Sequence, residues 1–246
     1  VSDIRAIEGS LCFFGVREID INNSSTEWLP ESEKEKKELH LYSFSHSKSN
    51  EPPENMPDAP VDLFVRSILA VEDIKDSEAP LNFYRRGILD IAEERFIEAI
   101  YDFYFVLETL YGNGKFKKSQ VLSEFIASTE LMGAVDKIEE EISPMLKTDP
   151  EKFLLLKEKY LKNTKEKILE NIIEIRGFLH HHTSKMDGIW HPANQKEYEV
   201  DAEVLLTICH CVLLTKLISI LFKENHLNEF HGTKVKRTEG QTIRWK

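Results

Sequence analysis

The sequence predicts a mainly α-helical protein, in which a helical bundle follows a small N-terminal segment that is irregular or contains β-strands. Three observations predict this fold class. The 246 residues include only 10 glycines and 9 prolines, the two residues that most disfavour a helix interior. From Val61 onward, apolar residues recur at intervals of three to four, which is the spacing of a buried helix face. Residues 1–50 lack this periodicity, so the helical part is expected to begin after them.

The N-terminal segment contains two short apolar runs, 11–16 and 39–44, that are typical of strands. Between them, residues 31–38 carry mixed charges, which predicts a solvated loop or a turn of helix. Residues 49–60 are rich in proline and polar side chains and are typical of a linker. A domain boundary is therefore expected within 48–60, and the residues before it are interpreted as the remnant of a preceding β-rich domain.

The chain is expected to divide into an N-terminal segment with its linker (1–60), a helical domain (61–225) and a basic C-terminal tail (226–246). Charge is distributed unevenly over these parts. Residues 1–80 carry 8 Lys and Arg against 17 Asp and Glu, whereas 233–246 carry 5 against 1. The net charge of −11 is opposite in sign to the basic surface typical of a nucleic-acid-binding protein, so such a partner would need a local basic area.

The best-defined predicted helix covers residues 81–111, where the apolar positions keep the spacing of a buried face throughout. Without a break it would span about 45 Å, a length that suits the spine of a bundle. Gly87 is the expected position of a kink or break, and residues 112–114 (GNG) are expected to end the helix. A shorter helix is expected before it, over residues 63–71.

The same periodicity predicts further helices along the rest of the chain. Asp149 and Pro150 are expected to open one of them, and Thr164 is expected to cap the next. Residues 183–199 are predicted to form a polar loop. Further helices are predicted over 121–142 (punctuated by Gly133), 150–160, 165–176 and 201–222. A short strand is predicted over 241–245.

Residues 204–222 form the most apolar run of the chain. Its threonines, serine, histidine and lysine favour a buried core helix over a membrane span, so no membrane association is expected. The three cysteines, Cys12, Cys209 and Cys211, do not form a disulfide framework, which is typical of a reducing compartment. No signal peptide is recognised at the start of the sequence, and a cytoplasmic location is therefore expected.

One stretch, residues 172–183 (IIEIRGFLHHHT), combines an arginine with three consecutive histidines at the end of a predicted helix. A guanidinium stays charged at all ordinary pH values, whereas an imidazole titrates near neutrality. The two together suit phosphodiester chemistry, because one group stabilises negative charge while the other transfers protons.

Two separated stretches, 101–112 (YDFYFVLETLYG) and 172–182 (IIEIRGFLHHH), resemble the Apea-like branch of the HEPN superfamily, and the resemblance covers roughly residues 76–225. It implies a helical bundle that dimerises and cleaves RNA without metal or cofactor, using the arginine and histidine of the family motif. It also implies a toxin-like role in bacterial anti-phage defence. Other members of the superfamily have lost activity and serve as binding or structural modules, and this alternative applies here as well.

Carried over to this sequence, the resemblance implies that Arg176 is the motif arginine and His181 the motif histidine, with His182 in an alternative register. Glu108 is the candidate acidic group that would orient Arg176. The sequence departs from the family pattern at Gly177, where many members carry Asn, Asp or His. On a continuous helix, His180 would share a face with Arg176. His181 would lie about 140° away from Arg176, so the helix is expected to end near Gly177, or the groups to meet across a dimer.

The mechanism that the resemblance implies is attack of an RNA 2′-hydroxyl on the adjacent phosphate. A histidine would act as general base or acid, and Arg176 would stabilise the phosphorane. The candidate phosphate contacts are Lys115, Lys117 and Lys118, although such a run is more often a solvated turn.

A metal site is the alternative to this mechanism, and its candidate ligands are His180, His182, His191 and the Cys209–Cys211 run. Successive helical residues point about 100° apart, so the Cys-His-Cys run cannot direct three side chains at one ion. No metal site is therefore expected.

Overall fold

The computed structural model describes most of the helical part of the chain and several shorter segments before and after it. In some of these segments only the backbone is described. The described residues are 2–16, 19, 24–27, 30, 32–38, 43–46, 61–146, 149–180, 190–232, 236–238 and 242–244.

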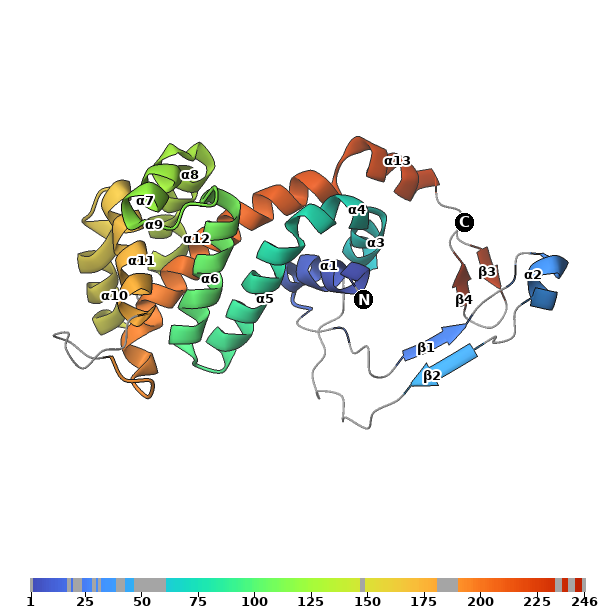
Figure 1. Ribbon diagram of the computed structural model, residues 1–246, viewed down its shortest axis with the longest axis horizontal. Helices are drawn as coiled ribbons and strands as arrows, with labels where there is room; N and C mark the ends of the chain where they lie inside the picture. The colour runs from blue at the N-terminus through green and yellow to red at the C-terminus, as the bar shows by residue number, and fades with distance from the viewer. Residues whose placement is uncertain are drawn as a thin grey trace.

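The described part of the chain is a bundle of α-helices with two small hairpins, so the predicted mainly α-helical class is confirmed (Figure 1). The α-helices are α1 Ser2–Leu11, α2 Glu33–Glu38, α3 Val61–Leu69, α4 Val71–Ile74, α5 Glu78–Ala92, α6 Phe96–Tyr111, α7 Lys118–Ala127, α8 Thr129–Asp136, α9 Ile138–Leu146, α10 Pro150–Leu156, α11 Lys165–His180, α12 Glu199–Leu221 and α13 Glu224–Gly232. Short 3-10 turns cover Cys12–Phe14, Lys75–Ser77 and Gln195–Tyr198, and a π-helical turn covers Lys157–Leu161.

Each hairpin is a pair of short antiparallel strands. Strand β1 (Ser24–Glu27) pairs with β2 (Ser43–His46), and β3 (Lys236–Thr238) pairs with β4 (Thr242–Arg244). Both are drawn to one side of the helical body in Figure 1. Strand β4 confirms the strand predicted at 241–245. Of the strand predicted at 39–44, residues 39–42 lie outside the described residues, and β2 begins at Ser43.

The prediction for the first residues of the chain was wrong in one respect, because residues 2–11 form helix α1 rather than irregular structure. The expected strand at 11–16 is the end of this helix followed by a 3-10 turn that Gly15 closes with a φ of 88°. Helix α1 packs on α3, α4 and α5, and buries Ala6 and Leu11 against them. The N-terminal helix is therefore part of the helical core. Most of the boundary expected within 48–60 lies outside the described residues.

Residues 81–111, predicted as one long helix, form most of the two antiparallel helices α5 and α6. The chain reverses at Glu93–Arg95, where Glu94 adopts the left-handed φ of 57° and Arg95 N donates to Asp90 O over 2.8 Å. Helix α5 runs through Gly87 without a break. A Cβ at Gly87 would lie 2.4 Å from the Phe103 ring, so the glycine allows α6 to approach α5 closely.

Helix α12 lies at the centre of the bundle and contacts α5, α6, α8 and α9. Its apolar run is buried in the bundle along much of its length, from Val200 to Leu221, as the prediction of a core helix requires. By length and composition alone, the span Gln195–Leu221 is also the one helix among the described residues that could cross a membrane. Packing inside the bundle accounts for the apolar character of its buried face.

The π-helical turn after α10 places two consecutive side chains on one buried carboxylate. Tyr160 Oη donates to Asp201 Oδ1 over 2.5 Å, and Lys159 Nζ lies 2.8 Å from both carboxylate oxygens. The wider π turn brings neighbouring side chains closer together than an α-helix does. Asp201, which is 1% exposed, is thereby paired and ties α12 to this turn.

The predicted helix starts near Asp149 and Thr164 are confirmed. Asp149 Oδ1 accepts a hydrogen bond from Lys152 N (3.2 Å), with Pro150 in the first turn of α10. Thr164 Oγ1 accepts from Lys167 N (3.3 Å) at the start of α11. Both side chains satisfy backbone N–H groups that a helix start leaves without a partner.

Candidate functional site

Helix α11 positions Arg176 on its inner face, one turn before its end. Ile172, Ile173 and Leu179 on the same helix are buried and fix its orientation against the bundle. The partly buried Arg176 therefore points toward α6 rather than into open solvent. Its Nε is enclosed and has no hydrogen-bond partner within the described residues, and no described carboxylate forms an ion pair with its guanidinium. A guanidinium in this state keeps its charge and its donors for a ligand.

One tyrosine of α6 contacts the guanidinium, and a second lies near enough for the Arg176 charge to act on it. The Arg176 Cζ lies 5.3 Å from the centre of the Tyr104 ring, within the range of a cation–π contact. Burial raises the pKa of Tyr104 to about 12, the charge of Glu108 adds to this, and the Arg176 charge opposes it. Burial also raises the pKa of Tyr101, and Arg176 again opposes the shift. Both phenols therefore stay neutral near pH 7 and can serve as hydrogen-bond donors.

Glu108 does not pair with Arg176 among the described residues, although it was expected to orient that side chain. Both charges instead act on the Tyr104 hydroxyl, which places them around the same ring. The stacked ring, rather than a carboxylate, holds the guanidinium in place. The net positive charge of the arginine is therefore not cancelled by a direct ion pair with Glu108.

The histidines follow Arg176 at the end of α11. The expectation that the helix ends near Gly177 was wrong, because α11 continues without a break to His180. Arg176 and the exposed His180 are thus four residues apart on one helix and share a face. His181 and His182 lie outside the described residues, so their relation to Arg176 stays a prediction. Nothing lies within 4 Å of the position that a Cβ on Gly177 would occupy.

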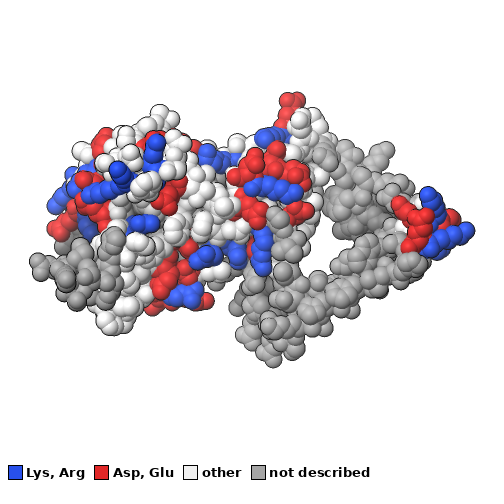
Figure 2. Space-filling view, viewed as in Figure 1, with Lys and Arg blue, Asp and Glu red and all other residues white. Residues whose placement is uncertain are grey.

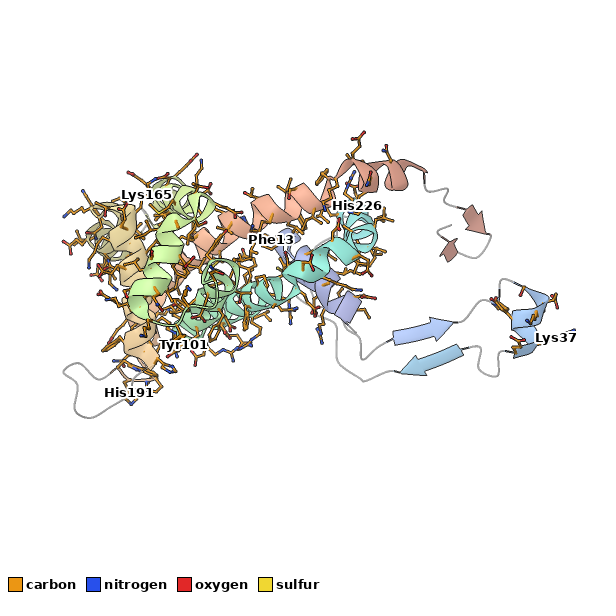
Figure 3. The ribbon with its side chains drawn as sticks, turned by 45° about the horizontal axis from the view of Figure 1, so that its top comes forward. Phe13, Lys37, Tyr101, Lys165, His191 and His226 are labelled. Atoms are coloured by element: carbon orange, nitrogen blue, oxygen red, sulfur yellow. The ribbon has the colours of Figure 1, made fainter. Side chains whose placement is uncertain are left out.

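Gln195, shortly before α12, contacts the start of α6. Gln195 Oε1 accepts a hydrogen bond from Ile97 N (2.8 Å) in the first turn of α6, and Gln195 Nε2 donates to Glu98. Figure 3 labels His191 at this end, and Tyr101 on α6. The first turn of α6 is therefore anchored to the residues that precede α12.

The three lysines proposed as phosphate contacts differ in their surroundings. Lys118 Nζ lies 2.6 Å from Glu174 Oε1 and 3.7 Å from Glu170 Oε1, and these ion pairs fix the start of α7 on α11. Its charge is offset by two carboxylates. Lys115 and Lys117 are exposed in the turn between α6 and α7, and no ion pair involves them in the described part of the chain.

The Cys-His-Cys run of α12 points in three directions, as helical geometry requires. Cys209 is fully buried and its Sγ donates to Phe103 O (3.3 Å), whereas His210 Nδ1 lies 2.7 Å from Tyr84 Oη. Burial lowers the pKa of His210, which therefore stays neutral at pH 7. No group of three metal-binding side chains is found within the described residues.

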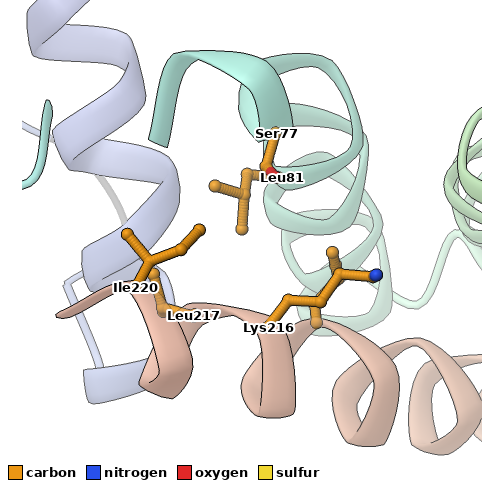
Figure 4. Close-up of a pocket in the computed structure, with 6 residues that line it drawn as sticks. Ser77, Leu81, Lys216, Leu217 and Ile220 are labelled. Atoms are coloured by element: carbon orange, nitrogen blue, oxygen red, sulfur yellow. The ribbon is translucent and has the colours of Figure 1, made fainter. Parts of the chain in front are cut away.

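The pocket found between α5 and α12 is too small to be a substrate site. Its volume is about 10 Å³, enough for one water molecule at most. Figure 4 shows its lining side chains, and Arg176 is not one of them. The pocket is lined by Ser77, Leu81, Leu213, Lys216, Leu217 and Ile220.

The surface around the bundle is mixed in charge. In Figure 2, acidic and basic side chains are interspersed on the face in view. This pattern agrees with the many exposed pairs such as Lys137–Glu140 and Lys165–Asp136. On this face, no broad area of a single charge is formed by the described residues.

Sequence reasoning missed Tyr101 and Tyr104 as neighbours of Arg176. They lie three residues apart on one predicted helix, a spacing that gives no sign of a site, and Tyr104 is buried. The pairing of α6 with α11 that brings them to Arg176 is a tertiary contact. The sequence carries no local signal for it.

Comparisons with models of known families, with curated proteins and with solved structures found no match for this chain.

Proposed function

We propose that this protein is a metal-independent endoribonuclease of the HEPN type, acting as a toxin-like component of anti-phage defence. The observation that supports it best is the state of Arg176. The side chain is anchored by Tyr104, is partly buried, and has no carboxylate partner among the described residues. Arginine in this state matches the bidentate geometry of a phosphate, and partial burial strengthens the interaction.

In the proposed reaction, the 2′-oxygen of RNA attacks the adjacent phosphorus, and the bond from phosphorus to the 5′-oxygen breaks. A histidine at the end of α11 accepts the 2′-hydroxyl proton, and a second, protonated histidine of the same run donates a proton to the leaving 5′-oxygen. Arg176 stabilises the negative charge that builds up on the phosphorane. The products are a 2′,3′-cyclic phosphate and a 5′-hydroxyl.

A homodimer is part of this proposal. Two copies of the Arg176 surface facing each other would double the guanidinium charge on one phosphate. The histidines of one copy would also come close to the arginine of the other. Such an arrangement does not depend on one helix presenting Arg176 and His181 on the same face.

The experiment is cleavage of tRNA and mRNA pools by the purified protein, with and without EDTA. Arg176→Ala should reduce the rate at least 100-fold, and His180→Ala, His181→Ala and His182→Ala tested one at a time should identify the titrating group. Lys162→Ala, an exposed cation with no ion pair among the described residues, is the matched control. Cleavage that is unchanged in Arg176→Ala, or that EDTA abolishes, would rule the proposal out.

A second candidate function is a non-catalytic dimerisation or ligand-sensing module. It is favoured by the unbroken course of α11 through Gly177, which leaves Arg176 facing the tyrosines of α6. This candidate predicts no RNA cleavage by the wild-type protein together with a dimer in solution. Sedimentation analysis of wild type alongside the cleavage assay separates the two functions.

A further inference from the structure

The turn between α6 and α7 presents an aromatic ring to solvent between two lysines. Phe116 is 83% exposed, the highest value among the exposed large apolar side chains of the described residues. Lys115 and Lys117 flank it and are exposed as well. Burying a phenylalanine side chain contributes about 1.5–3 kcal/mol, so a ring held almost wholly in water is available for a partner.

The turn that carries Phe116 is well defined. Asn113 and Gly114 adopt the left-handed φ values of 47° and 67°, and Lys115 N donates to Gly112 O over 2.8 Å. A Cβ at Gly112 would lie 2.5 Å from Glu108 O, so the backbone passes too close to α6 for a larger residue. Two residues after Phe116, the ion pairs of Lys118 hold the chain to α11. Phe116 is therefore presented from a turn fixed at both ends.

We propose that the tip formed by Lys115, Phe116 and Lys117 binds single-stranded RNA, with the Phe116 ring stacking on an unpaired base and the lysines contacting the flanking phosphates. The choice of RNA as the polyanion rests on the proposed function. An aromatic ring between cations is the arrangement by which proteins bind single strands without reading their sequence. A base inside a duplex is already stacked on its neighbours, so the tip selects unpaired segments.

Charge supports this partner over a neutral or cationic one. Lys115 and Lys117 are not offset by described carboxylates, whereas Lys118 is. A lipid surface would need several apolar side chains inserted together, and the tip offers a single ring. Stacking needs only one ring, so a nucleic-acid strand fits the tip better than a membrane does.

Lys118, which follows the tip, contacts α11 on a face other than that of Arg176. Lys118 contacts Glu174, which precedes Arg176 by two residues and points about 200° away from it around the helix axis. The ion pair that anchors the tip and the guanidinium of Arg176 therefore use different faces of α11. The tip is accordingly a binding element for substrate and is separate from the cleavage chemistry.

The test uses the full chain and a labelled single-stranded dT12, which has no 2′-hydroxyl and cannot be cleaved by the proposed mechanism. Phe116→Ala should weaken binding by about 5- to 100-fold, and Phe116→Trp should preserve it. The plot of log affinity against log salt concentration has a negative slope, and Lys115→Ala and Lys117→Ala should each make this slope less steep by about 0.7. Leu154→Ala, another exposed apolar side chain (55%), is the control and should bind as wild type does. A duplex of the same length should bind more weakly.

Each outcome separates this inference from the proposed function. Binding that depends on Phe116 without any RNA cleavage would keep the inference and remove the ribonuclease proposal. RNA cleavage with a KM that is unchanged in Phe116→Ala would keep the ribonuclease proposal and remove the inference. A KM that is raised in Phe116→Ala, with kcat within twofold of wild type, would support both the ribonuclease proposal and the inference. Absence of single-strand binding, or Phe116-dependent binding to vesicles containing anionic lipid instead, would overturn the inference.

Discussion

The guanidinium carbon of Arg176 lies 5.3 Å from the centre of the Tyr104 ring, so helix α11 holds its arginine against an aromatic face of α6. The contact fixes the plane of the guanidinium without neutralising it, as a carboxylate would. Tyr104 itself is buried and stays un-ionised, because burial raises the pKa of its phenol to about 12. Arg176 is therefore both anchored and available to an anion.

The Arg176–Tyr104 contact predicts a measurable coupling energy. In a double-mutant cycle of Arg176→Met and Tyr104→Leu, the coupling in unfolding free energy should be about 0.5–2 kcal/mol, because both members of a partly desolvated cation–π pair are removed. The matched cycle with Tyr104→Phe keeps the ring and should couple far less. Urea unfolding gives both values. A coupling near zero in the leucine cycle would mean that the ring does not hold the arginine.

Gly177→Ala should stabilise the protein by about 0.5–1 kcal/mol, because glycine inside a helix costs backbone entropy and nothing lies within 4 Å of the new methyl group. Urea unfolding of the two proteins measures the gain. The RNA cleavage rate, if present, should stay within a fewfold of wild type. A destabilised Gly177→Ala protein would indicate that the helix does not continue through this residue.

Gly87→Ala should destabilise the protein by about 1–3 kcal/mol or more, because its methyl group would overlap the buried Phe103 ring at 2.4 Å. Gly133→Ala is the control: it lies in α8 with nothing within 4 Å of the new Cβ, and should be neutral or stabilising. Differential scanning calorimetry compares the two. Equal melting temperatures would show that α5 and α6 have room to separate.

Much of the fold was predictable because it depends on local periodicity. The apolar spacing from Val61 onward predicts helices, and capping by Asp149 and Thr164 locates two of their starts. The reversal at Glu94 was not predictable, since a glutamate with a φ of 57° replaces the glycine or proline that normally marks a turn. Helix α1 was not predictable from apolar periodicity, because the polar residues Glu8 and Ser10 occupy buried positions in it.

The site was predictable only in part. A single sequence locates Arg176 and the histidines on one helix end, because that relationship is local. Tyr104 and Tyr101 reach Arg176 only through the packing of α11 on α6, to which nothing in the local pattern points. Similarly, Lys118 looks like a free cation in the sequence, but Glu170 and Glu174 on a distant helix offset its charge.

Tyr160→Phe should destabilise the protein by about 1–3 kcal/mol, because Asp201 loses its buried hydroxyl donor and keeps only Lys159. Tyr198→Phe is the matched control, since no hydrogen bond of its hydroxyl is found in the described part of the chain and its phenol is less buried. Urea unfolding at pH 7 compares the two variants. An equal effect of both would show that the Asp201 contact contributes nothing specific.

Asp102 on α6 predicts a pH dependence of stability. Its side chain is 4% exposed and lies 3.2 Å from Arg86 Nε, while Asp90 hydrogen-bonds to it and is itself held by Arg95. Burial raises the pKa of Asp102 to about 6, from an ordinary value of 3.8, and Arg86 opposes this shift. Between these two pH values the folded state binds more protons at this group than the unfolded state does.

The contribution of Asp102 to stability should therefore fall as pH rises from about 4 to 6, by up to about 3 kcal/mol. Asp102→Asn keeps a neutral hydrogen-bond donor toward Asp90 at every pH and should remove this dependence of the unfolding free energy on pH. Asp76→Asn, an exposed aspartate, controls for the loss of one charge. Because other groups titrate as well, the measured quantity is the difference in unfolding free energy between wild type and each variant from pH 4 to 7.5. For Asp102→Asn this difference should shift in favour of the variant as pH rises, and a flat difference would mean that Asp102 stays ionised throughout, paired with Arg86.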